Sequence, residues 1–124
     1  MRKKNIDTFL IPLLFTLVCC GGSPKVRILN NRLNLGDVKR YDTLNCVFPI
    51  INDGDSPLLI TKLKGSCECI SIVWDSTKVL SGDTTYIKVR LVPDVVGVST
   101  KDIVFQTNTN PPFNTLSIET NVKE

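Results

Sequence analysis

The chain has 124 residues, of which 15 are basic, 12 are acidic and none is histidine. This length accommodates one domain with one hydrophobic core. The absence of histidine excludes Ser-His-Asp and Cys-His catalysis, histidine metal ligands and histidine pH switches. No nucleophile–base pair is visible elsewhere in the sequence, so we expect no enzyme activity, no catalytic residues and no cofactor.

The N-terminus has the pattern of a secretory signal peptide. The basic residues 2–4 precede an apolar run at 9–19 that contains Pro12. A transmembrane helix needs about 20 apolar residues, so this run is too short to span a bilayer. A basic start followed by a short apolar stretch is typical of a signal peptide.

Residues Leu17, Val18, Cys19 and Cys20 resemble a bacterial lipobox, whose last cysteine is acylated and becomes the new N-terminus. Leu17 occupies the third position before Cys20, and the small residue Cys19 directly precedes it. The competing register would acylate Cys19 and would place Thr16 where the motif has leucine, which is a weaker match.

A plain secretory signal cut near residues 21–22 is the alternative to acylation. We prefer acylation because a cysteine followed by two glycines is unusual at the end of a signal peptide. The predicted organisation is a lipoprotein signal peptide at 1–19, a lipidated Cys20 with its tether at 20–25, and one domain at 26–124. Gly21, and not aspartate, follows Cys20. By similarity to the sorting rules of bacterial lipoproteins, this implies the periplasmic side of the outer membrane.

The mature chain would be nearly neutral. Removal of residues 1–19 takes away three of the 15 basic residues and one of the 12 acidic residues, which leaves a net charge of +1. This balance gives no argument for nucleic acid or for a small-molecule substrate. The expected partners are the membrane, through the N-terminal lipid, and an unidentified envelope protein.

The rest of the chain predicts short strands separated by turns, as in a sandwich or barrel. We expect seven strands, at 26–35, 41–51, 58–63, 70–74, 86–91, 102–106 and 116–122, the first of them interrupted at residues 30–31. Between the second and third strands, Gly54 and Asp53 indicate a turn, because Gly permits a positive φ and Asp tolerates one. Each strand has one apolar and one polar face, which favours antiparallel sheets packed face to face.

Seven strands in about 100 residues match an immunoglobulin-like β-sandwich, which is the all-β fold that we predict. The clearest alternation places Ile87, Val89 and Leu91 on one face and Tyr86, Lys88 and Arg90 on the other. The second set could form a binding strip, but we interpret it as a solvated sheet face, which explains it better. The predicted core contains Phe48, Ile60, Trp74, Val89, Phe105 and Ile118.

Three cysteines remain beyond the lipobox, at positions 46, 67 and 69. In a strand, the Cα atoms of Cys67 and Cys69 would lie roughly 6.6 Å apart, at the long edge of the range for a disulfide. The alternatives are a disulfide, two structural thiols, or a soft-metal or redox site with Cys46 or Glu68 as a third ligand. We favour a structural role, because an isolated C-x-C is a weak metal signal. Cys46 shares a face with Phe48, so we expect a buried, inert thiol.

Residues 48–118 carry a further pattern. Asn52, Gly54, Pro57, Leu58 and Ile60 form one segment, and Ser66, Cys67 and Cys69 form a second. Together they resemble a bacterial family of immunoglobulin-like exported proteins without an assigned function, marked by a Ser-Cys-Gly-Cys-Thr signature. Glu68 and Ile70 depart from that signature.

The resemblance implies an architecture similar to PapD-like and major-sperm-protein sandwiches, and it supplies no known reaction. The expected function is a non-catalytic, lipid-anchored domain that binds a protein or stabilises an envelope assembly. The alternative is a thiol-based metal-binding or redox protein that uses Cys67 and Cys69.

Overall fold

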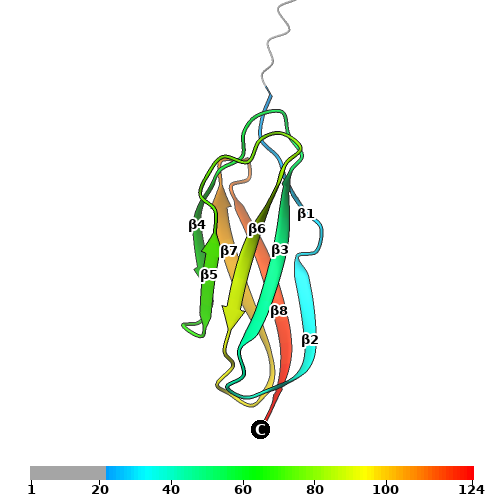
Figure 1. The fold of residues 1–124 in the computed structure, drawn as a ribbon, viewed down its shortest axis with the longest axis vertical. Helices are drawn as coiled ribbons and strands as arrows, with labels where there is room; N and C mark the ends of the chain where they lie inside the picture. The colour runs from blue at the N-terminus through cyan, green and yellow to red at the C-terminus, as the bar shows by residue number, and fades with distance from the viewer. Residues whose placement is uncertain (1–21) are drawn as a thin grey trace, which may run out of the picture.

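The computed structural model describes residues 22–124, which form two four-stranded sheets packed face to face (Figure 1). The strands are β1 (Val26–Ile28), β2 (Arg32–Lys39), β3 (Leu44–Asn52), β4 (Ile60–Gly65), β5 (Ile70–Trp74), β6 (Thr84–Leu91), β7 (Gly97–Thr107) and β8 (Phe113–Lys123). The predicted signal peptide at 1–19 and Cys20 lie outside the described residues. No helix within 22–124 has the length and apolar character to span a membrane.

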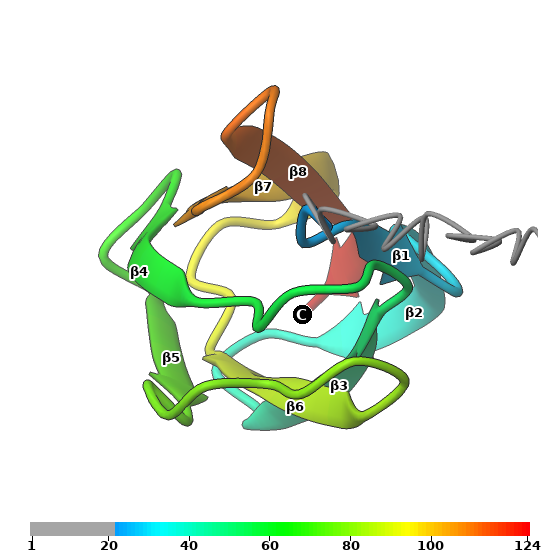
Figure 2. The same ribbon diagram turned by 90° about the horizontal axis from the view of Figure 1, so that it is seen from above.

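Sheet A has the strand order β1-β3-β6-β5, and sheet B has the order β2-β8-β7-β4. Figure 2 shows the two layers from above, with β3, β6 and β5 on one side of the core and β7 and β8 on the other. The all-β sandwich predicted from the sequence is therefore confirmed. One pair departs from the antiparallel expectation, because β2 runs parallel to β8.

The strand count is eight and not seven, because the expected strand at 26–35 is divided. Its first part pairs with β3 in sheet A, and its second part pairs with β8 in sheet B. The side-chain oxygen of Asn30 accepts a hydrogen bond of 3.2 Å from the backbone N–H of Arg32. This local bond supports the bend at which the chain passes from one sheet to the other.

The core lies between the sheets and follows the period-two pattern of the strands. Its buried members include Phe48, Ile50, Leu58, Ile60, Ile87, Val89, Leu91, Ile103, Phe105, Leu116 and Ile118. Five of the six predicted core residues are buried. Trp74 packs against the core as predicted, but its side chain is only partly buried. Trp74 ends β5, which is an edge strand of sheet A, so the core covers it incompletely.

The two ends of the sandwich carry different loops. One end, which we call the N-terminal end, holds residues 22–25 and the loops 53–59, 75–83 and 108–112 (top of Figure 1). The other end holds the loops 40–43 and 92–96 together with the C-terminus. Any ligand or partner therefore meets either one of these ends, a sheet edge, or the outer face of one sheet.

Candidate functional site

Cys67 and Cys69 lie in the turn between β4 and β5 and form a disulfide, with their Cα atoms 5.3 Å apart. The separation is shorter than the strand value, because the pair lies in a turn. The turn is hydrogen-bonded on both sides, to the end of β6 in sheet A through Cys69 and to β7 in sheet B through Ser66, which precedes Cys67. The N–H of Val92 donates to the carbonyl of Cys69 at 3.1 Å, and that of Ser66 donates to the carbonyl of Asp102 at 2.9 Å. The disulfide therefore braces the crossing from sheet B to sheet A.

This arrangement leaves the pair without a thiolate, which is the form of cysteine that binds a metal. Cys46 lies in the middle of β3, facing the core, and is 5% exposed. Burial raises the pKa of its thiol, which favours the protonated and inert form. Within residues 22–124, no group of three or more histidine, cysteine or acidic residues is placed to hold a metal ion.

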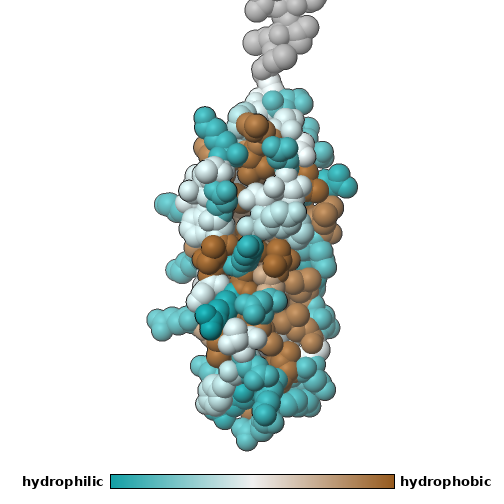
Figure 3. Space-filling model, viewed as in Figure 1, coloured by the Kyte–Doolittle hydropathy of each residue, from teal (hydrophilic) through white to brown (hydrophobic). Residues whose placement is uncertain are grey.

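The outer face of sheet A has an unusual composition, and we call it the sheet A face. Its side chains, at alternate positions of four strands, are Arg27, Asn45, Val47, Pro49, Ile51, Ser71, Val73, Thr84, Tyr86, Lys88 and Arg90. This set contains three cations and no carboxylate. Val73 is 66% exposed and Tyr86 is 51% exposed, so the face also presents large apolar groups to solvent. Figure 3 views this face and shows brown apolar atoms interleaved with teal polar ones.

The strand register places a cation between apolar neighbours. Lys88 pairs with Val47 on one side and with Val73 on the other. Cross-strand neighbours have Cβ atoms about 5 Å apart, so Lys88 is flanked by both valines. Arg90 lies two residues further along β6. Within the described chain, the ion pairs are Arg32–Glu119 and Arg40–Glu124, and neither involves a cation of this face.

An open hollow of about 560 Å³ lies at one end of this face. Its lining comprises Val73, Trp74, Asp75, Ser76, Thr84, Thr85, Tyr86 and Lys88. The indole N–H of Trp74 donates to the carbonyl of Ile60 at 3.4 Å, which turns the ring toward sheet B. Asp75 is the one carboxylate of the lining. The backbone N–H of Thr77 donates to it at 2.9 Å and holds the pKa of this carboxyl below its usual value.

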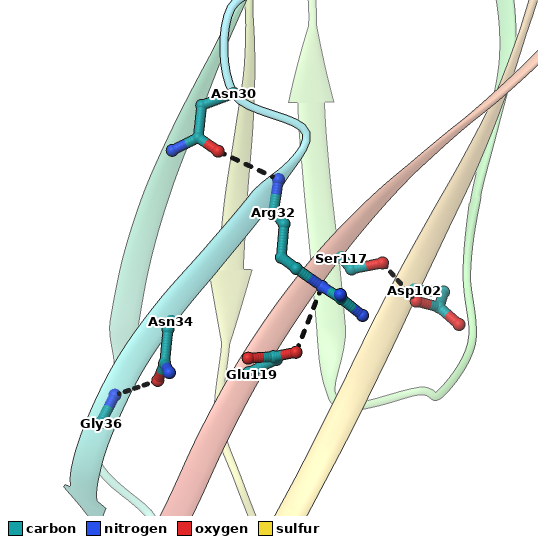
Figure 4. A network of polar contacts seen from close by, with 7 residues as sticks. All are labelled: Asn30, Arg32, Asn34, Gly36, Asp102, Ser117 and Glu119. Atoms are coloured by element: carbon teal, nitrogen blue, oxygen red, sulfur yellow. Dashed lines mark hydrogen bonds and ion pairs between the residues drawn. The ribbon is translucent and has the colours of Figure 1, made fainter.

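The outer face of sheet B is different, because it carries carboxylates as well as cations and some of these groups are partnered within the sheet (Figure 4). Arg32 and Glu119 form an ion pair of 3.1 Å, and the Ser117 hydroxyl donates to Asp102 at 2.7 Å. Exposed ion pairs of this kind contribute little stability, but they do satisfy the local charges. Within residues 22–124, Lys62 and Lys64 of sheet B form no ion pair either, but they share their face with Asp37, Asp102 and Glu119, whereas the sheet A face carries cations and no carboxylate. This contrast in charge makes the sheet A face the better candidate for binding.

Sequence reasoning missed one structural residue, and it preferred a solvated face to a binding strip at Tyr86, Lys88 and Arg90. Asn52 was noted only in the segment that resembles the exported family, yet it is fully buried at the end of β3. Tyr86, Lys88 and Arg90 were interpreted as a solvated face, and they are exposed as expected. The missing signal was the absence of acidic residues at the outward positions of β3 and β5, which can be read from the sequence once the strand order is known.

The fold is an immunoglobulin-like β-sandwich, similar to those of PapD-like domains and major sperm proteins. A PapD-like domain of human CEP192 superposes with a TM-score of 0.67 at 11% identity, covering 81% of this chain and 86% of that one. WR4, a member of the major-sperm-protein family from C. elegans, gives a TM-score of 0.52 at 12% identity, covering 79% and 97%. At these identities the likeness shows the fold alone.

The chain belongs to the DUF1573 family of proteins of unknown function, whose family model matches residues 26–122. A protein of unknown function from Porphyromonas gingivalis W83 superposes with a TM-score of 0.70 at 18% identity. The superposition covers 79% of this chain, which spans 46% of the length of that one. No curated protein matches the sequence.

Proposed function

We propose that this protein is a non-catalytic, lipid-anchored domain on the periplasmic side of the outer membrane, and that its sheet A face binds an acidic segment of an envelope protein. The observation that carries the binding proposal is the position of Lys88, an unpaired cation flanked by two exposed valines. The lipobox-like residues ending at Cys20 support the anchor.

Charge complementarity determines the chemistry of the partner. Three cations without a carboxylate favour an acidic segment, and Val47, Val73 and Tyr86 favour apolar or aromatic side chains within it. Opposite charges at an interface mainly raise the association rate and the specificity, whereas buried aromatic contacts supply most of the affinity. The hollow beside Tyr86 is large enough to receive an aromatic side chain from the partner.

The binding proposal is tested with a defined probe, a random glutamate–tyrosine copolymer. We expect the purified protein to bind it, with an affinity that falls as the salt concentration rises. The double variant Lys88→Glu/Arg90→Glu should lose binding. The matched control is Lys62→Glu/Lys64→Glu, which makes the same change of charge on the outer side of β4 in sheet B. An equal loss of binding in both double variants would mean that only the net charge of the protein matters, and it would contradict the proposal.

The anchor is tested separately by intact-mass measurement. In a bacterial host that processes lipoproteins, the mature protein should begin at Cys20 and should carry acyl chains. These chains would hold the protein at the membrane, because each buried CH₂ group contributes about 0.8 kcal/mol to membrane binding. The Cys20→Ala variant should remain unprocessed. A Cys20→Ala variant that is cleaved and membrane-bound like the wild type would refute acylation at this residue.

A further inference from the structure

Residues 22–25 are bonded into the N-terminal end of the sandwich, and we call them the strap. The Ser56 hydroxyl donates to the carbonyl of Gly22 at 2.6 Å. The backbone N–H of Asp55 donates to the carbonyl of Ser23 at 3.1 Å, and that of Asp53 donates to the carbonyl of Lys25 at 2.9 Å. The segment expected to be a tether is thus paired with the loop after β3 from Gly22 onward.

Gly54 explains how the strap approaches so closely. A Cβ atom at this position would overlap the backbone of Ser23, Pro24 and Lys25. Gly54 is not among the residues with positive φ, so the expected reason for this glycine was wrong. Its role is to let two backbones touch. A side chain at position 54 would therefore push the strap off the domain.

The strap leaves almost no free chain between the domain and the anchor. Cys20 precedes Gly22 by two residues, and two residues of extended chain span at most about 7 Å. We propose, on the basis of the lipid anchor of the preceding section, that the N-terminal end of the sandwich is held in contact with the lipid surface. The domain then has no flexible linker that would let it reach far from the membrane.

The surface of the N-terminal end is compatible with a membrane contact that the lipid anchor, and not the surface itself, maintains. Leu80 and Phe113 are 57% and 61% exposed there, so apolar side chains are available to the lipid interface. The charged residues of the strap and the three loops are Lys25, Asp53, Asp55, Asp75, Lys78 and Asp83. Because aspartates outnumber lysines, this end has no electrostatic attraction for anionic lipid. The acyl chains, and not the loops, must therefore supply the membrane affinity.

This placement has a consequence for the partner. The strands β7 and β8 have 11 residues each, which corresponds to a length of roughly 35 Å. The C-terminal end therefore stands that much further from the membrane. The hollow of the sheet A face is lined by Asp75, Ser76 and Thr84, which lie toward the N-terminal end. A segment that fills the hollow must accordingly come from the part of a partner that lies nearest to the bilayer.

The experiment uses the acylated protein in nanodiscs that contain a gadolinium-chelating lipid, with NMR amide signals as the readout. We expect strong broadening for the loops 53–59, 75–83 and 108–112, and little for the loops 40–43 and 92–96. A variant with a flexible Gly/Ser linker of about 20 residues inserted before Gly22, roughly 25 Å in r.m.s. length, should lose most of this contrast. Gly54→Val should lose part of it, because the strap detaches.

Three results would overturn the inference. Equal broadening at both ends of the wild type would mean that the strap does not set the orientation. A contrast that persists after linker insertion would mean that the loops bind lipid by themselves. A mass spectrum without acyl chains on Cys20 would refute the anchor and this inference together, whereas the first two results leave the anchor intact. Hydrogen-exchange protection of the Asp53 and Asp55 amides verifies that the strap is docked in each sample.

Discussion

The side-chain amide of Asn52 donates a hydrogen bond of 2.8 Å to the backbone carbonyl of Val79, which ties the end of β3 to the loop before β6. The same amide donates to the carbonyl of Ser56 at 2.7 Å, and its oxygen accepts from the N–H groups of Gly54 and Lys25. One buried side chain therefore joins the strap and two loops. The N-terminal end of the sandwich depends on it.

Replacing Asn52 with alanine should lower the free energy of unfolding by about 3 kcal/mol, since it leaves several buried backbone groups without a partner. Urea denaturation measures this loss. Asn45→Ala is the matched control, because Asn45 lies on the same strand but is exposed, and it should change stability by less than about 0.5 kcal/mol. Similar losses of unfolding free energy in the two variants would show that Asn52 does not hold this end of the sandwich together.

The Cys67–Cys69 disulfide should contribute little to stability. It closes a loop of only three residues, for which the chain-entropy relation gives about 1.5 kcal/mol. The double variant Cys67→Ser/Cys69→Ser should therefore stay folded, with a modest loss in urea denaturation. We also expect no bound metal in the wild type. Stoichiometric copper or zinc in protein purified without added metal, lost in the double variant, would instead support the thiol-based function.

Trp74 and Phe48 should differ in their contribution to the core. Phe48 is fully buried, whereas Trp74 is half-buried at the edge of sheet A. Phe48→Ala should cost about 4 kcal/mol, and Trp74→Ala about half of that, because part of the indole already contacts water. Denaturation of the two variants gives the comparison. An equal or larger loss for Trp74→Ala would show that its ring is covered in solution.

Cys46 should make stability depend on pH in the alkaline range. Its folded-state pKa is raised by burial, whereas an unfolded thiol ionises near pH 8.5. A group whose folded pKa is raised contributes stability that is present below the unfolded pKa and is lost as the pH rises through the folded one. The difference in unfolding free energy between the wild type and Cys46→Ala should therefore shrink as the pH rises above about 8.5. A difference in unfolding free energy that stays constant with pH would contradict the conclusion that the Cys46 thiol is buried and has a raised pKa.

Much of the fold could be predicted from the sequence, because strand faces are a local property. The alternation of Ile87, Val89 and Leu91 in β6 fixes which side is buried, whatever strand lies beside it. The same reasoning placed Cys46 and Phe48 on one inward face. Which strands pair with each other depends on residues far apart in the sequence, so the parallel pairing of β2 with β8 could not be predicted.

The candidate site was harder to predict for the same reason. Val47, Lys88 and Val73 lie on three different strands, and only the register brings them side by side. The buried environment of Asn52 depends on Val79, which is 27 residues away in the chain. Trp74 continues an apolar pattern that predicts burial, but its strand is at an edge, and sequence periodicity does not distinguish edge strands from central ones.

The most direct test of the sheet A face is photocrosslinking in intact cells. A photoreactive amino acid replaces Val73 on the sheet A face or, as the matched control, the exposed Val104 on the outer side of sheet B. We predict a discrete product of higher mass from position 73, a yield that falls when Lys88→Glu is added, and no such product from position 104. The same product from both positions, or none from position 73, would contradict the proposed binding surface.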